Sequence, residues 1–314
     1  MVRRAVLRVI ATTALLAASG GAGAHVAPPA LESVAPDLGG DAGWIVAALV
    51  ATGALYGFGV YRLWRAAAPL HGLRTADVLS FAAGWAVLAC ALLGPLDAWA
   101  VHSFSAHMLQ HEALMLVAAP LLVRGRPLAA WAWALSRNGR VRARRIFATR
   151  AWHRVWRGFT RPLGATTLQL VVLFVWHVPA VFDDAARHAG LHALQHLSFL
   201  AAALCFWWAT RPPLLAYQAA RATTGPAIAA LFITMIVTGA LGALLTFAPA
   251  PWYHAYGGVA LPWAGSALED QQLAGLLMWV PGGAIYCVCG LLHAWRLLAR
   301  TPATRAAVLV SGVR

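Results

Sequence analysis

The chain has 314 residues, of which 61% are hydrophobic and only 11% are charged. This composition excludes a water-soluble globular domain, which carries more charge and less apolar surface at this length, and it indicates a bilayer protein. The net charge of +14 comes entirely from arginine, because the sequence contains no lysine. The arginines lie between apolar runs, as the positive-inside rule requires, so we expect contact with lipid and no nucleic-acid partner.

The first 24 residues have the composition of a secretory signal. Three arginines precede an apolar stretch that ends near Ala18, and the small residues Ala22-Gly23-Ala24 follow. We predict a signal peptide over residues 1–24, with an uncleaved anchor helix as the alternative. Residues 25–43 are then an extracytoplasmic linker.

Seven apolar runs follow, each close to the ~20 residues that a spanning helix needs. They lie at 44–64, 78–98, 103–123, 163–182, 190–209, 226–248 and 272–296. Arginine-rich connections alternate with connections that hold acidic residues, which places the N-terminus outside and the C-terminus in the cytoplasm. The prediction is an all-α, polytopic protein of the bacterial cytoplasmic (inner) membrane, with a seven-helix domain over residues 44–300 and a cytoplasmic tail over 301–314.

Residues 124–161 form the longest basic connection, predicted to be cytoplasmic. Arginines alternate there with Trp131, Trp133, Trp152 and Trp156. This mixture suits a short helix at the headgroup boundary, attracted by anionic lipid and anchored by tryptophan. A topology signal without further function and a docking site for a partner are the alternatives.

Nine of the twelve histidines lie at or toward the predicted outer side. The third run reaches a full span only if His107, Gln110, His111 and Glu112 lie inside the membrane, and the fifth run repeats this situation. Polar groups at such depth are costly and by default functional. We therefore expect one polar site shared by the third, fourth, fifth and seventh helices.

The pattern H-x-L-Q-H occurs twice, at residues 107–111 and 192–196. Histidines four residues apart lie on one helix face, so both imidazoles can reach one metal ion. Imidazole with a thioether suits copper, whereas imidazoles alone suit zinc, iron or haem equally well. Histidines bonded to backbone carbonyls of neighbouring helices are the structural alternative. The candidate ligands are His107, His111, His177, His192, His196 and Met115, and the candidates for a surrounding shell are His188, Glu112, Asp270, Gln271 and Gln272.

Common catalytic patterns do not occur. The sequence contains no H-E-x-x-H, no G-x-S-x-G and no G-x-x-x-x-G-K-[ST], which are typical of zinc proteases, α/β-hydrolases and P-loop proteins. We expect a protein that binds and transfers rather than an enzyme.

Three stretches resemble the CtaG-type, integral-membrane family of cytochrome c oxidase assembly factors. They are residues 107–111 running on to 119–122, residues 176–180 continuing through 192–199, and residues 270–275 continuing through 278–283. The resemblance implies a role in producing active haem-copper oxidase, by delivering or inserting copper at the outer side, with oxidase subunits as partners. Glu112 stands where relatives are expected to have an apolar residue such as methionine, so either the pocket is more acidic here or Glu112 faces another helix.

Two other functions fit parts of the pattern. A b-type haem protein would use one histidine from the third run and one from the fifth as axial ligands in an electron-transfer bundle. A transporter for copper or a small solute would use the polar cluster as its mouth. Polar residues are scarce in the predicted cytoplasmic halves of the helices, which argues against a continuous path.

Overall fold

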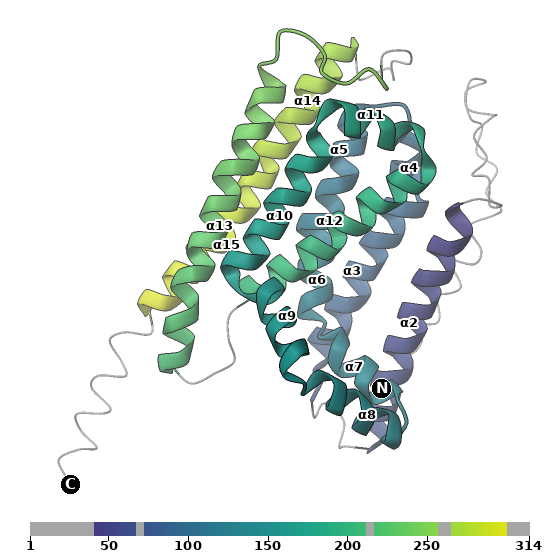
Figure 1. Cartoon of the computed structure of the whole chain (residues 1–314), viewed down its shortest axis with the longest axis vertical. Helices are drawn as coiled ribbons and strands as arrows, with labels where there is room; N and C mark the ends of the chain where they lie inside the picture. Colours follow the sequence, from purple (N-terminus) through teal and green to yellow (C-terminus); the bar gives the residue numbers. More distant parts are fainter. Residues whose placement is uncertain (1–40, 67–71, 212–216, 257–264, 300–314) are drawn as a thin grey trace.

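The computed structural model describes residues 41–66, 72–211, 217–256 and 265–299 (Figure 1). Within these ranges the chain is built from helices and turns and contains no strand, which confirms the all-α prediction. The predicted signal peptide, most of the predicted linker and the tail at 301–314 lie outside the described residues.

Six helical segments are long and apolar enough to cross a membrane. They are α2 (Asp41–Ala66), α3 (Thr75–Leu93), the continuous segment α5 (Phe104–Glu112), η1 (Ala113–Ala118) and α6 (Ala119–Arg124), then α12 (Ala189–Thr210), α13 (Tyr217–Thr246), and α14 (Ala267–Trp279) with α15 (Pro281–Ala299). A seventh crossing exists if α9 (Arg150–Thr160) and α10 (Pro162–His177) count together, although they meet at 65°. The described residues therefore contain six candidate spans, or seven with this bent pair.

Prolines divide three of the predicted runs. The prediction of one helix over 163–182 is wrong, because α10 ends at His177, Val178 is extended (φ −64, ψ 122) and α11 (Pro179–Arg187) starts anew. Run 78–98 breaks in the same way at Gly94, where α4 (Pro95–Ala100) begins. Run 272–296 begins earlier, at Ala267, and is divided at Val280. Proline disfavours helical geometry in the residue before it, and Gly94 and Val178 are indeed extended. Val280 keeps helical geometry (φ −82, ψ −67), so the division there reflects the missing N–H of Pro281.

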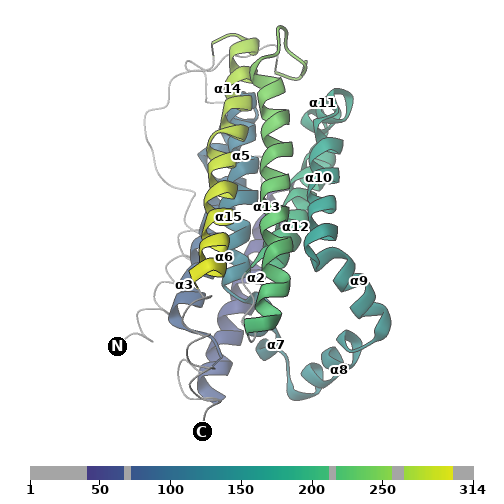
Figure 2. The same cartoon turned by 90° about the vertical axis from the view of Figure 1, so that its left-hand side faces the viewer.

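The histidine cluster and the arginine-rich helices lie at opposite ends of the bundle. We call the end where α5, α12 and α14 begin the histidine end; α4 and α11 lie there as well (Figure 1). The opposite, arginine end holds α7 (Pro127–Ala134), α8 (Arg137–Phe147) and α9 (Figure 2). The basic connection predicted over 124–161 is thus largely helical.

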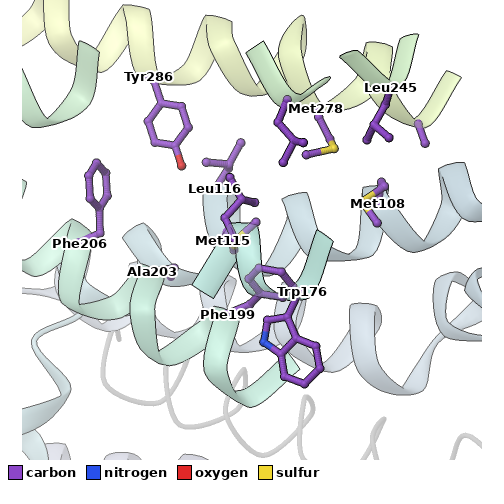
Figure 3. Close-up of a cluster of buried hydrophobic side chains, with 14 of the residues drawn as sticks. Met108, Met115, Leu116, Trp176, Phe199, Ala203, Phe206, Leu245, Met278 and Tyr286 are labelled. Atoms are coloured by element: carbon purple, nitrogen blue, oxygen red, sulfur yellow. The ribbon is translucent and has the colours of Figure 1, made fainter. Parts of the chain in front are cut away.

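A buried hydrophobic cluster joins η1 to α10, α12, α13, α14 and α15 (Figure 3). Helices α13 and α14 approach each other closely at two glycines: a Cβ on Gly275 would lie 2.5 Å from the carbonyl oxygen of Gly242. Small residues permit such close backbone contact between membrane helices. This contact fixes the position of α14, whose first turn carries Asp270 and Gln271.

Candidate metal centre

The start of α5 is fixed by a carboxylate from another helix. Asp270 of α14 accepts hydrogen bonds from the Ser103 hydroxyl (2.9 Å) and from the backbone N–H groups of Phe104 (2.6 Å) and Ser105 (3.2 Å). The first N–H groups of a helix have no partner within the helix, and a negative charge there is favourable. This buried cap therefore sets where His107, one turn further on, lies.

Three imidazoles from two helices meet below this cap. The ligand atoms of His107, His192 and His196 all lie within 4.8 Å of one another. Three nitrogens bound to one metal at ~2.0–2.1 Å lie about 3.5 Å apart, so binding requires the rings to close by about 1 Å. His107 is only 2% exposed and His196 is also buried, whereas His192 is half-buried.

His111 adds a fourth ring to this group. Its ring centroid lies 4.3 Å from that of His107 and 5.2 Å from that of His196. Among the described residues, neither ring nitrogen of this buried side chain has a hydrogen-bond partner. Unpaired buried polar atoms are rare in folded proteins, which makes His111 a candidate fourth ligand.

The hydrogen bonds of Tyr256 favour one tautomer of His107. The Tyr256 hydroxyl lies 2.9 Å from His107 Nδ1 and donates to the carbonyl oxygen of Ala100 at 3.1 Å. Burial raises the pKa of this hydroxyl, which stays protonated. Its single proton goes to the carbonyl, so the hydroxyl oxygen accepts from Nδ1–H, and Nε2 of His107 keeps the lone pair that a metal needs. Nε2 is buried and has no hydrogen-bond partner within the described chain.

The loop that carries Tyr256 is held by polar side chains of two other helices. Asp183 of α11 accepts from the backbone N–H groups of His254 (3.1 Å) and Ala255 (3.0 Å), and Gln271 of α14 accepts from that of Trp252 (2.6 Å). The sequence did not single out Tyr256 or Asp183 as residues of the site. A loop residue has no helical periodicity, so the sole available signal was its position at the predicted outer side.

His177 lies at the border of the group. Its Nδ1 contacts the Leu173 carbonyl oxygen at 2.7 Å, and its Nε2 has no partner among the described residues. The ring of Phe199 contacts both neighbours, with centroids 4.6 Å from His111 and 6.4 Å from His177. His177 therefore faces the same interior but is not one of the three convergent imidazoles.

Met115 belongs to the hydrophobic cluster (Figure 3), and its sulfur accepts from Gln169 Nε2 at 3.6 Å. The stripe predicted from His107 through His111 to Met115 assumes regular α-helical spacing. The π-helix η1 begins directly after Glu112 and changes that register. The structure thus places Met115 among apolar side chains.

Most residues predicted to surround the site instead form hydrogen bonds with backbone groups. His188 is exposed at the start of α12, with Nδ1 2.8 Å from the Asp184 carbonyl oxygen, and Gln272 donates to that of Ala248 at 3.3 Å. Glu112 faces α15: a Cβ on Gly282 would lie 2.7 Å from its Oε2. Of the two options for Glu112, the structure shows contact with another helix.

Gln110, between the histidines of the first H-x-L-Q-H pattern, points to α3 and α4. Its amide donates to the carbonyl oxygen of Ala91 (2.7 Å) and to Asp97 (2.8 Å). Burial raises the pKa of Asp97, although this hydrogen bond and the nearby His192 oppose the shift. The carboxyl group of Asp97 thus lies near His192, the most accessible of the three convergent imidazoles.

Comparison with known proteins identifies the family. The family described as cytochrome c oxidase caa3 assembly factor matches residues 54–300, which is most of the chain. Uncharacterized proteins of Mycobacterium bovis and Mycobacterium tuberculosis are each 29% identical over 185 residues, covering 56% of this chain and 27% of the relative. The aligned region is thus about a quarter of each relative's length. No solved structure matches the chain. The extent of the family match shows that the chain belongs to the caa3-type cytochrome c oxidase assembly factors.

Proposed function

We propose that this protein assists assembly of a cytochrome c oxidase by binding copper at the histidine end and passing it to an oxidase subunit outside the cytoplasm. The ligands are His107, His192 and His196, with His111 as a fourth. One observation carries the proposal: the three ligand atoms lie within 4.8 Å of one another at one end of the bundle. Membership of the family supports the oxidase as the destination.

The donor set fits a copper ion. Neutral imidazole suits copper, zinc, iron and nickel, and among divalent first-row metals such a site binds Cu²⁺ most tightly. Imidazole alone does not select one metal. The family assignment makes the selection here, because a haem-copper oxidase needs copper during its assembly.

The unequal burial of the imidazoles suits reversible transfer. His192, half-buried near the start of α12, is the ligand that an incoming or departing ion meets first, with Asp97 nearby. His107 and His196 are buried and hold the ion. The proton that Tyr256 keeps on Nδ1 of His107 leaves Nε2 free to bind without a preceding proton transfer.

Metal titration tests the site directly. Purified full-length protein would be titrated with Cu⁺ under reducing conditions against a chromophoric chelator, and with Zn²⁺ in parallel. We expect His107→Ala and His196→Ala each to weaken Cu⁺ binding at least ~100-fold, since each removes one of few ligands. His254→Ala is the matched control, because its side chain is 83% exposed at the same end. Its imidazole lies 3.5 Å from Asp183, but the backbone N–H groups that Asp183 binds remain in the variant.

Delivery is tested in membranes. Cells that lack the protein would be complemented with each variant, and oxidase activity and oxidase-bound copper measured. We expect His107→Ala and His196→Ala to lower both, and His254→Ala to restore both. Equal Cu⁺ binding by all variants would refute the metal centre, and a Soret band that shifts on reduction would assign haem to it instead.

A further inference from the structure

Helices α8 and α9 form a strongly basic projection, which we call the basic arm and define as residues 137–161. It contains Arg137, Arg140, Arg142, Arg144, Arg145, Arg150, Arg154, Arg157 and Arg161. The sequence has no acidic residue between Glu112 and Asp183, so nothing within the arm neutralises this charge. Neither α8 nor α9 contains a buried residue.

The arm projects sideways from the bundle at the arginine end (Figure 2). Contacts at both of its ends hold it there. The guanidinium of Arg140 lies 4.5 Å from the ring centroid of Trp133 in α7, and Trp156 packs edge-on against Trp208 of α12 at 5.6 Å. The arm is therefore an ordered surface whose orientation the bundle sets.

Helix α9 is amphipathic in a specific way. Trp152, Val155, Trp156 and Phe159 are spaced i, i+3, i+4 and i+7, so they form one apolar stripe. Arg150, Arg154 and Arg157 lie on the opposite face. Val155 is 54% and Phe159 47% exposed, so the bundle leaves much of the apolar stripe uncovered.

The length of α10 places α9 at a membrane surface. Sixteen residues of α-helix extend about 24 Å, less than the ~30 Å of a hydrocarbon core. The chain turns by 65° between α9 and α10, so α9 does not continue the direction of α10 across the hydrocarbon core. An apolar stripe facing the acyl chains, with arginines above it, is the arrangement of an interfacial helix.

We propose that the basic arm binds anionic phospholipid headgroups, with α9 lying in the headgroup layer as a surface helix. Arginine guanidinium groups form paired hydrogen bonds with phosphate oxygens, and exposed tryptophan favours the interface. Charge alone would also attract a soluble acidic protein. The exposed apolar stripe beside the arginines favours lipid, because it needs an apolar phase as well as negative charge.

The test uses full-length protein in neutral detergent, titrated with phosphatidylglycerol or phosphatidylcholine, with bound lipids counted by native mass spectrometry. We expect a clear preference for phosphatidylglycerol. Arg150→Gln, Arg154→Gln and Arg157→Gln together should reduce that preference at least about tenfold, since each arginine near an anionic surface contributes roughly fivefold. Val155→Ser with Phe159→Ser should weaken binding of both lipids.

The matched control changes three exposed arginines at the same end of the bundle but outside the arm: Arg65, Arg124 and Arg296, each to glutamine. This variant loses the same charge but keeps the arm, so it should lose much less of the lipid preference than the arm variant does. Helix content by circular dichroism and the thermal melting temperature show that each variant is folded. The proposal is overturned if the arm variant matches wild type, if the control loses as much, or if soluble polyglutamate binds the arm as tightly as phosphatidylglycerol does.

Discussion

At the histidine end, polar side chains are buried and bonded across helices, whereas at the arginine end the charged side chains of α8 and α9 are exposed. The single carboxylate of Asp270 joins α14 to the start of α5 through three hydrogen bonds. The basic arm contacts the bundle through a few aromatic rings. Polar groups at the first end thus determine geometry, and those at the second provide a charged surface.

The strongest test of this difference is removal of the Asp270 carboxylate. Asp270→Ala leaves the backbone N–H groups of Phe104 and Ser105 without their partner in a buried place, whereas the Ser103 hydroxyl keeps its contact with Ser105. We therefore expect the free energy of unfolding to fall by about 3 kcal/mol. Denaturation of the purified protein in mixed micelles measures it. Asp184→Ala is the control, because that side chain is exposed at the same end. Equal stability of both variants would contradict a structural role for the cap.

A second test concerns the contact that positions α14. Gly275→Ala introduces a Cβ that collides with the backbone of Gly242, so α13 and α14 must separate, at an expected cost of about 2 kcal/mol. Gly190→Ala is the control: no atom lies within 4 Å of its added Cβ. Thermal melting compares them. A melting temperature of Gly275→Ala at or above that of Gly190→Ala would show that this contact is not tight.

Tyr256→Phe tests how the proton on His107 is placed. Without an acceptor for Nδ1–H, the tautomer and the ring orientation of His107 are no longer fixed. We therefore expect the Cu⁺ affinity to fall about tenfold. Tyr253→Phe is matched to it, since its hydroxyl donates to the His177 carbonyl oxygen at 3.2 Å and not to an imidazole. The same loss of affinity in both variants would assign the effect to the loop and not to the tautomer.

The smallest effect is expected at His188. This residue was a candidate for the surrounding shell, yet it is exposed and contacts backbone at the start of α12. We expect His188→Ala to change Cu⁺ affinity by less than about twofold and stability by less than about 0.5 kcal/mol, as for most surface substitutions. A tenfold loss in the same titration would restore His188 to the site.

The sequence predicted which imidazoles lie together better than it predicted the residues that hold them in place. Two H-x-L-Q-H turns place histidines on one helix face, and the rings of His107 and His111, and of His192 and His196, lie 4.3 Å apart. Met115 does not lie with these histidines, because the π-helix η1 changes the register of the stripe. A π-helix cannot be recognised from apolar spacing. Asp183 and Tyr256 lie in different segments, and their shared role depends on a loop reaching across the bundle.

The sequence by itself determined the helical architecture and the histidines that face one another, because these depend on hydrophobic runs and on spacings of three and four residues. It indicated the family through three stretches that resemble known members. Only the tertiary structure decided that Glu112 faces Gly282 and that the Tyr256 hydroxyl contacts His107. Such contacts join residues far apart in the chain. Their geometry comes from packed helices and hydrogen-bonded loops, for which local periodicity contains no information.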